Sequence, residues 1–297
     1  MSVTERSSAA RIWLMAARPR TLPAAVAPVL VGTALAATGG TFKPLTFLAA
    51  LIGALFIQVG TNLSNDYSDA RRGADTEDRL GPVRVTAGGL MPPRRVLVGT
   101  YVAFGVAVAA GLYLAAVAGW ELLVVGAASI LAGVLYTGGP RPYGYEGLGE
   151  LFVFLFFGVV AVAGSYFVQT EELRWEAVAL GVPVGLLASA ILVVNNVRDI
   201  DTDRRAGKRT LAVKLGRERA RRLFVAMVAL AFVIPVLLVP ALSAWLLLPL
   251  AALPLAPPLV RTVTTSTDGP ALNGALAATG RLLAVYSLLL AGGVLLS

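Results

Sequence analysis

The stretch that decides the fold is residues 45–69, LTFLAALIGALFIQVGTNLSNDYSD, in which a long apolar run ends in a group of amides and carboxylates. A helix needs roughly 20 apolar residues to cross the hydrocarbon core of a bilayer. Similar runs recur along the chain, which is 57% hydrophobic and 14% charged, with a mean hydropathy of +0.77. The runs are too long and alternate too little for barrel strands. The sequence therefore predicts an all-α integral membrane protein.

We expect nine transmembrane helices around a central cavity, because nine apolar segments are long enough to serve as spans. Their approximate ranges are 22–38, 45–65, 96–118, 120–137, 148–169, 176–197, 222–241, 244–263 and 276–296. The eighth range contains four prolines and is expected to be kinked or broken. Residues 1–297 are expected to form a single polytopic domain, with 1–21 as a cytoplasmic N-terminal segment.

The basic residues predict the orientation. All but three of the 25 Lys and Arg residues fall in the N-terminal segment and in every second connection after it. The positive-inside rule then places the N-terminus and the two long basic loops in the cytoplasm. Positive charge divided among loops that flank apolar spans argues against nucleic-acid binding. We expect a multi-pass protein of the cell membrane (the cell inner membrane), with its active site facing the cytoplasm.

The acidic residues gather in two clusters, each at the predicted cytoplasmic end of a long apolar helix. Asn62, Asp66 and Asp69 would share one face of a helix, because residues three and four apart are neighbours there. Asn195, Asp199 and Asp203 step by four and do the same. Carboxylates stacked on one face repel one another, so each cluster needs a compensating cation.

The chain contains neither histidine nor cysteine, which excludes disulfides, thiolate nucleophiles, haem ligation and most zinc sites. Hard oxygen ligands favour Mg²⁺, which usually takes one or two carboxylates and completes its shell with water and phosphate oxygens. Basic side chains beyond the clusters could neutralise the rest of a diphosphate. The candidates are Arg72, Arg79, Lys208 and Arg209. The alternative, ordinary salt bridges at helix ends, explains one such cluster better than two matching ones.

Two stretches carry a family resemblance. Residues 62–69, continuing through Asp75 and Asp78, resemble the first Asp-rich motif of UbiA-type intramembrane prenyltransferases, and residues 195–203 resemble the second. Four further stretches are similar to the branch that prenylates 1,4-dihydroxy-2-naphthoate in menaquinone synthesis: 17–22, 75–86, 207–213 and 272–280. In much of the superfamily the last acid of the first motif stands at the position that Gly73 occupies in this chain. The next acid is Asp75, and the longer gap is shared by the menaquinone branch.

The resemblance implies a reaction. A polyprenyl group would pass from polyprenyl diphosphate to 1,4-dihydroxy-2-naphthoate, with loss of CO₂ and diphosphate, giving demethylmenaquinol. Mg²⁺ would be the cofactor, in contact with Asn62, Asp66, Asp69, Asp75, Asp199 and Asp203. Asp66, Asp69, Asp199 and Asp203 would be the catalytic acids. The substrate-binding candidates are Arg20, Arg72, Arg79, Tyr136, Arg141, Tyr143, Asn195, Asn196, Arg198, Lys208 and Arg209. Which of Asp75 and Asp78 would reach the metal stays open.

Several alternatives remain at this stage. Arg20 is equally well explained as a charge that snorkels to the membrane interface. Tyr145 is expected in an interfacial aromatic belt. Four small residues could line an apolar groove or pack helices together: Gly158, Ala161, Ala163 and Gly164. The rival functions are prenylation of another aromatic acceptor such as 4-hydroxybenzoate and, in a different class, a cation-coupled transporter. A transporter would place its acids near the bilayer midplane.

Overall fold

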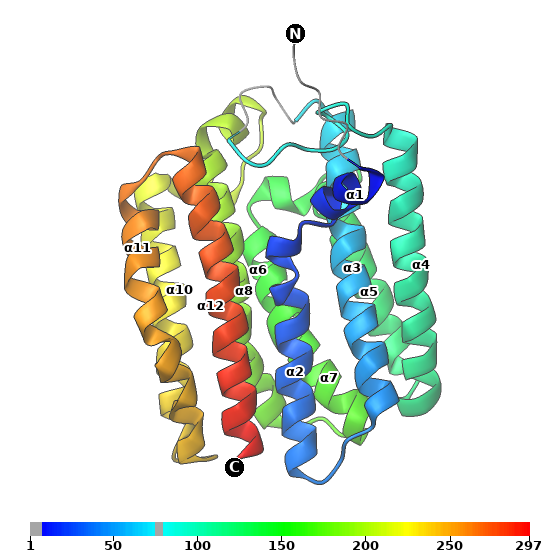
Figure 1. The fold of residues 1–297 in the computed structure, drawn as a ribbon, viewed down its shortest axis with the longest axis vertical. Helices are drawn as coiled ribbons and strands as arrows, with labels where there is room; N and C mark the ends of the chain where they lie inside the picture. Colours follow the sequence, from blue (N-terminus) through cyan, green and yellow to red (C-terminus); the bar gives the residue numbers. More distant parts are fainter. Residues whose placement is uncertain (1–7, 75–79) are drawn as a thin grey trace.

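Within residues 8–74 and 80–297, which the computed structural model describes, every regular element is helical (Figure 1). The long α-helices are α2 (Pro23–Thr38), α3 (Pro44–Arg71), α4 (Pro93–Ala118), α5 (Glu121–Leu135), α8 (Trp175–Arg205), α10 (Arg217–Leu238) and α12 (Gly269–Leu295). The shorter elements are α1 (Ala9–Ala17), η1 (Pro19–Thr21), η2 (Tyr143–Glu146), α6 (Gly149–Phe154), η3 (Leu155–Val160), α7 (Ala161–Thr170), α9 (Leu211–Leu215), η4 (Ala244–Leu255) and α11 (Ala256–Thr265).

The described helices meet the prediction of a multi-pass membrane protein. Seven of them are long and apolar enough to cross a membrane, counting α6–η3–α7 and η4–α11 as one each. The α1–η1 segment and α2 pass the same test only together, as a pair bent by 53°. Helix α5 is apolar but has only 15 residues. All nine predicted ranges are therefore helical, although two of them fall short of a full span on their own.

The fifth and eighth predicted segments depart from regular α-helix. Residues Leu155–Val160 form a π-helical turn between α6 and α7. Pro249 and Pro254 lie in η4, a 3₁₀ segment of 12 residues. Proline has no amide hydrogen to donate, so it interrupts the α-helical bonding pattern. The predicted break in the eighth segment is confirmed.

Helices α3 and α8 run further than the apolar spans predicted at 45–65 and 176–197, and the acidic residues beyond those spans lie on helix, as their spacing predicted. Both helices continue through their acidic residues, to Arg71 and Arg205. A glycine with positive φ follows each end, Gly73 at 65° and Gly207 at 75°. Such glycines commonly end helices. The described acids of both clusters therefore lie on helices and not in loops.

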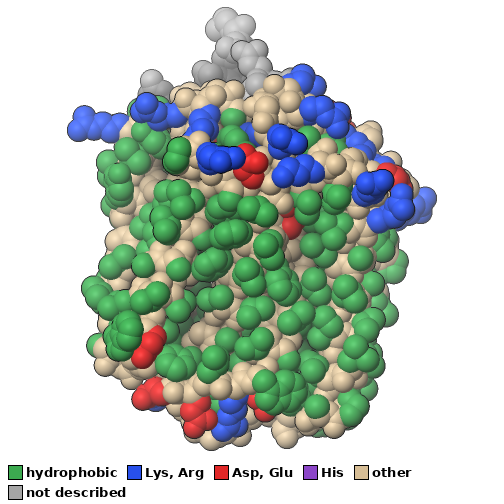
Figure 2. Space-filling model, turned by 180° about the vertical axis from the view of Figure 1, so that it is seen from behind, with side chains coloured by type: hydrophobic (Ala, Val, Ile, Leu, Met, Phe, Trp, Pro, Cys, Tyr) green, Lys and Arg blue, Asp and Glu red, His purple; other side chains and the backbone are tan. Residues whose placement is uncertain are grey.

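The helices stand side by side in Figure 1, with α10, α11 and α12 on one side, α3, α4 and α5 on the other, and α2, α6, α7 and α8 between them. Helix α8 is the most enclosed, with 72% of its apolar window buried. The connections that follow α3 and α8 lie at the same end of the molecule, where α1 also lies across the bundle. Figure 2 shows Lys and Arg side chains at this end, above a broad hydrophobic belt.

Glycines bring η3 and α8 into close contact. A Cβ atom added at Gly158 would lie 2.4 Å from the Cα atom of Gly185 and 2.7 Å from the carbonyl oxygen of Gly181. Gly158 therefore serves helix packing, one of the two expected roles of the small residues. Ala161 and Gly164 instead line the central cavity, and Ala163 is buried in a small apolar cluster with Tyr166 and Ala177.

Candidate functional site

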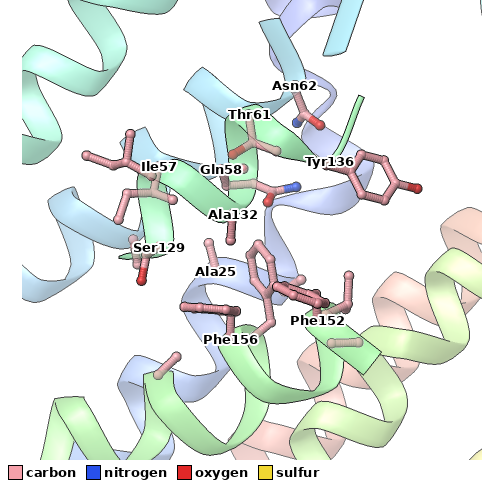
Figure 3. Close-up of a pocket in the computed structure, with 18 of the residues that line it drawn as sticks. Ala25, Ile57, Gln58, Thr61, Asn62, Ser129, Ala132, Tyr136, Phe152 and Phe156 are labelled. Carbon is pink, nitrogen blue, oxygen red and sulfur yellow. The ribbon is translucent and has the colours of Figure 1, made fainter. Parts of the chain in front are cut away.

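A cavity of about 510 Å³ lies in the middle of the bundle, between α2, α3, α5, α6–η3–α7 and α8. Figure 3 shows Asn62, Gln58 and Tyr136 toward one part of it and Phe152 and Phe156 toward another. Its polar lining includes Arg18, Asn62, Asn65, Asp69, Arg84, Tyr145, Asn195, Asn196, Asp199, Asp203 and Lys208. Much of the rest is apolar, from Ile57 on α3, Ile130 on α5 and Phe157 on η3. The cavity therefore combines a charged end with an apolar body.

Both acidic helices contribute to the charged end. Asp69 comes from α3, and Asp199 and Asp203 come from α8, although 130 residues of chain or more separate the two groups. Amide side chains from the same helices line the cavity beside them: Asn62, Asn65, Asn195 and Asn196. The fold thus brings the two sequence clusters to one place.

Of the acids of the first cluster that the structure describes, Asp69 makes the most contacts. Its Oδ1 accepts a hydrogen bond of 2.6 Å from the Tyr145 hydroxyl. Its Oδ2 lies 3.4 Å from Arg84 Nη2 and 3.4 Å from Lys208 Nζ. The side chain is buried, so these cations offset the cost of removing its charge from water. Asp69 therefore faces two cations within the cavity wall.

Asp66 takes a different direction. Its Oδ2 accepts from the Val85 backbone amide at 3.1 Å, and its Oδ1 accepts from the Thr86 amide at 2.9 Å. Asp66 is buried and is not among the residues that line the cavity. The structure thus turns its carboxylate toward the connection between α3 and α4.

Arg198 organises the second cluster. Its Nε and Nη2 atoms donate to the two carboxylate oxygens of Asp199 at 2.8 and 2.6 Å. Nη2 also donates to Asn195 Oδ1 at 2.7 Å, and Nη1 donates to Asn273 Oδ1 on α12 at 2.6 Å. Arg198 is 1% exposed and does not line the cavity. Arg198 instead holds the side chains of Asp199 and Asn195, which line the cavity.

Asn196 is held by a buried acid that the sequence did not single out. The Asn196 Nδ2 atom donates to Glu150 Oε1 at 2.8 Å. Because the amide nitrogen is engaged there, the amide oxygen is left to face other groups. Ser189 donates to the backbone carbonyl of Glu150 at 2.9 Å, which ties α6 to α8.

The predicted basic residues divide into two groups. Lys208 is buried, lines the cavity, and places Nζ 4.8 Å from the centre of the Tyr145 ring. Arg20, Arg141 and Arg209 are exposed and do not line the cavity. Arg72 is also exposed, and its guanidinium donates to the Gly139 carbonyl. Asp75 and Arg79 lie outside the described residues.

Three tyrosines lie at the same end of the cavity. Tyr136 and Tyr143 both line it, with ring centres 5.6 Å apart in an edge arrangement. The Tyr143 ring stacks on Phe152 at 4.1 Å, and burial raises the pKa of its hydroxyl. Tyr145 contacts Asp69 and lines the cavity, so its expected place in an interfacial belt was wrong.

Four of the polar lining residues named above were not among the predicted site residues: Arg18, Asn65, Arg84 and Tyr145. Asn65 carried a signal, because Asn65 and Asp69 repeat the four-residue spacing of Asn195 and Asp199. Arg18 lies two residues before Arg20, which was the predicted substrate-binding residue. Its guanidinium donates to the Asn62 carbonyl at 3.4 Å. Arg84 and Tyr145 reach Asp69 only through the tertiary fold.

The donors at the charged end fit a hard cation. Across residues 8–74 and 80–297, no three acidic side chains gather closely enough to bind a metal by themselves. The cavity instead offers separate carboxylates on α3 and α8, together with amide side chains from the same helices. Such a donor set suits Mg²⁺ that completes its shell with phosphate oxygens.

Comparisons with known proteins agree with this arrangement. Residues 25–273 match the model of the UbiA prenyltransferase family. The chain is 42% identical to 1,4-dihydroxy-2-naphthoate octaprenyltransferase of Mycobacterium leprae, over 96% of each chain. It is 43% identical to the enzyme of that name from Escherichia coli, over 73% of each chain.

Solved structures show the same fold. A UbiA homolog from Archaeoglobus fulgidus, bound to DMAPP and Mg²⁺, superposes with a TM-score of 0.64 at 15% identity. The match covers 94% of this chain and 98% of that one. With a family match over most of its length and relatives above 40% identity, this multi-pass membrane protein belongs to the UbiA prenyltransferase family.

Proposed function

We propose that this chain transfers a polyprenyl group from polyprenyl diphosphate to 1,4-dihydroxy-2-naphthoate, releasing CO₂ and diphosphate and giving demethylmenaquinol. The observation that carries the proposal is the meeting of Asp69, Asp199 and Asp203 with Lys208 and Arg84 at the charged end of an otherwise largely apolar cavity. A diphosphate suits the charged end, and an isoprenoid chain suits the apolar body. The relatives' names, from matches over 96% and 73% of the chain, support the acceptor.

Asp69, Asp199 and Asp203 would hold Mg²⁺. The amide oxygens of Asn62 on α3 and of Asn195 and Asn196 on α8 would assist them. When bound, Mg²⁺ neutralises charge that develops on the diphosphate oxygens. Asp75, which lies outside the described residues, stays a predicted ligand. Asp66 was predicted as a ligand too, but it does not line the cavity, and its carboxylate oxygens accept two backbone amides of the connection after α3.

The chain's own cations bind the leaving group. Lys208 and Arg84 lie beside Asp69 and would donate to the diphosphate as the allylic C–O bond breaks and its electron pair moves to oxygen. Arg18 lines the same cavity and adds a third cation. The ring faces of Tyr136 and Tyr143 would stabilise the allylic cation, as aromatic faces attract positive charge.

The acceptor's carboxylate simplifies the second half of the reaction. A new C–C bond forms between the allylic carbon and the ring carbon that bears the carboxylate. The C–CO₂ bond then breaks, and its electrons restore the aromatic ring. Since CO₂ leaves in place of a proton, the ring carbon needs no general base.

We further propose nine spans, a single domain over residues 1–297 and a cytoplasmic active site. This count adds two segments to the seven long apolar helices: the bent pair of α1–η1 with α2, and the short helix α5. The basic end of the molecule in Figure 2 supports the orientation through the positive-inside rule. Asp69 lies two residues from the end of α3 and Asp203 two from the end of α8, whereas a transporter would need its acids near the middle of a helix.

A competition assay tests the proposal. Purified protein receives Mg²⁺, a polyprenyl diphosphate, and equal concentrations of 1,4-dihydroxy-2-naphthoate and 4-hydroxybenzoate. We expect prenylated naphthoquinol as the dominant product, identified by mass spectrometry. Prenylated benzoate as the dominant product would show that the enzyme prefers another class of acceptor. No prenylated product from either acceptor would contradict the proposal.

A further inference from the structure

The connection between α3 and α4 is anchored more firmly than an exposed loop requires. We refer to residues 80–91 as the 80–91 loop. Val85 is 1% exposed and Met91 is 6% exposed, and both pack into an apolar cluster with Ala16, Leu63 and Val96. The Met91 amide also donates to the Val85 carbonyl at 3.0 Å, which closes the loop on itself.

Asp66 supplies the polar anchor of this loop. Its two carboxylate oxygens accept from the successive amides of Val85 and Thr86 at 3.1 and 2.9 Å. Successive backbone amides form a concave site for an anion, and here the anion is a side chain of the protein itself. Asp66 is 2% exposed, so these bonds form away from competing water.

The anchored residues adjoin the only residue of the 80–91 loop that lines the cavity. Arg84 directly precedes Val85, lines the charged end, and places Nη2 3.4 Å from Asp69 Oδ2. Its side chain is 10% exposed. An arginine can present two parallel donors to a phosphate, provided that its backbone is held in place. Asp66 holds that backbone one residue away.

A second tether joins the same loop to the other acidic helix. Asn273 on α12 donates through Nδ2 to the Leu80 carbonyl at 3.0 Å. Its Oδ1 accepts from Arg198 at 2.6 Å, and Arg198 holds Asp199 with two hydrogen bonds. The 80–91 loop is thus tied to both acidic helices at once.

We propose that Asp66 is a positioning residue and not a metal ligand: it fixes the 80–91 loop so that Arg84 reaches the diphosphate. This inference rests on the proposed function for the ligand of Arg84, but the anchoring by Asp66 does not depend on it. It replaces the sequence-based expectation that Asp66 binds Mg²⁺ beside Asp69.

The test compares four purified full-length variants with the wild type: Asp66→Asn, Asp69→Asn, Arg84→Gln and the double variant Asp66→Asn/Arg84→Gln. Arg71→Gln is the charge-matched control for Arg84→Gln, because Arg71 is exposed and does not line the cavity. One readout is amide hydrogen exchange over residues 80–91. The other is calorimetric binding of inorganic pyrophosphate, titrated at several Mg²⁺ concentrations. Asp66→Ser, which keeps one acceptor in a smaller side chain, replaces Asp66→Asn if that variant does not fold.

We expect faster exchange over 80–91 in Asp66→Asn and not in Asp69→Asn or the control. Pyrophosphate affinity should fall about tenfold or more in Asp66→Asn and in Arg84→Gln, as for a lost charge-assisted hydrogen bond. The double variant should be no weaker than Arg84→Gln alone, because both changes remove the same contact. The half-saturating Mg²⁺ concentration should rise in Asp69→Asn only.

Two results would overturn the proposal. A rise in half-saturating Mg²⁺ for Asp66→Asn as large as that for Asp69→Asn would make Asp66 a ligand. Unchanged exchange over 80–91 in Asp66→Asn would remove its role as an anchor. If the wild type bound no pyrophosphate with Mg²⁺, the proposed function would fall, and Arg84's role with it. The exchange readout would still decide the anchoring.

Discussion

The Tyr145 hydroxyl donates a hydrogen bond of 2.6 Å to the carboxylate of Asp69. This contact links η2, which follows α5, to the acidic end of α3. The Tyr145 carbonyl also accepts from the Arg209 backbone amide at 2.9 Å, so the connection after α8 joins the same point. Lys208 lies over the ring. Three segments far apart in the sequence therefore meet around one carboxylate that lines the cavity.

Removing this hydroxyl should reduce activity without unfolding the protein. Tyr145→Phe keeps the ring beneath Lys208 but removes the donor to Asp69 Oδ1, and a hydrogen bond to a charged group contributes about 1.5–3 kcal/mol. We expect kcat/KM to fall about tenfold in steady-state assays. Tyr101→Phe, at an exposed tyrosine on α4, is the control. Equal activity of Tyr145→Phe and the control would mean that the contact does not orient Asp69.

Arg198 should be required for stability as well as for activity. Arg198→Met removes the buried cation that holds Asp199, Asn195 and Asn273. Breaking a buried ion pair from one side costs about 3–5 kcal/mol. We expect a large drop in Tm in detergent and no measurable turnover. Arg198→Lys keeps the charge but cannot make the two parallel bonds, so its Tm should lie between those of the wild type and Arg198→Met. An unchanged Tm in Arg198→Met would contradict this account.

Glu150 should act through its acceptor oxygen and not through its charge. Glu150→Gln retains an oxygen that can accept from Asn196, whereas Glu150→Leu leaves the buried Asn196 amide without that partner. An unsatisfied buried donor costs about 1–3 kcal/mol. We expect a lower Tm and a lower kcat/KM for the leucine variant, and values near the wild type for glutamine. Equal losses in both variants would show that the carboxylate itself is needed.

The contact between η3 and α8 should tolerate no added methyl group. Gly158→Ala would place Cβ within van der Waals overlap of Gly185 and Gly181, and overpacking typically costs about 1–3 kcal/mol. We expect a lower Tm. Gly105→Ala on α4 is the matched control, because no atom lies within 4 Å of a Cβ built there, and alanine favours helix. A higher Tm for Gly158→Ala than for Gly105→Ala would contradict the packing described here.

The sequence predicted the helices well because lipid imposes long apolar runs that are visible without a structure. The predicted apolar spans end before α3 and α8 do, since apolarity stops where the polar residues begin. The backbone hydrogen bonds continue past that point, as far as the turns at Gly73 and Gly207. Helix geometry persists through charged residues when their side chains find partners in the fold.

The site was predicted in part, and Asp66 shows where spacing is insufficient. At about 100° per residue, Asn62 and Asp69 lie in the middle of one face of α3, with Asn65 at one flank and Asp66 at the other. Spacing alone cannot say that the 80–91 loop covers that flank and takes both oxygens of Asp66. Arg18, which the sequence did not single out, lines the cavity, whereas the predicted Arg20 is exposed and does not. Arg18 ends α1 with a φ of 53°, a local conformation that charge counting does not detect.

The release of CO₂ with each prenyl transfer tests the central claim most directly. Purified wild-type protein and the Asp199→Asn variant receive Mg²⁺, a polyprenyl diphosphate and 1,4-dihydroxy-2-naphthoate labelled at its carboxyl carbon. For the wild type, we predict equal amounts of labelled CO₂ and prenylated naphthoquinol, and neither from the variant. A prenylated product that keeps the label, or turnover by Asp199→Asn at the wild-type rate, would contradict the account.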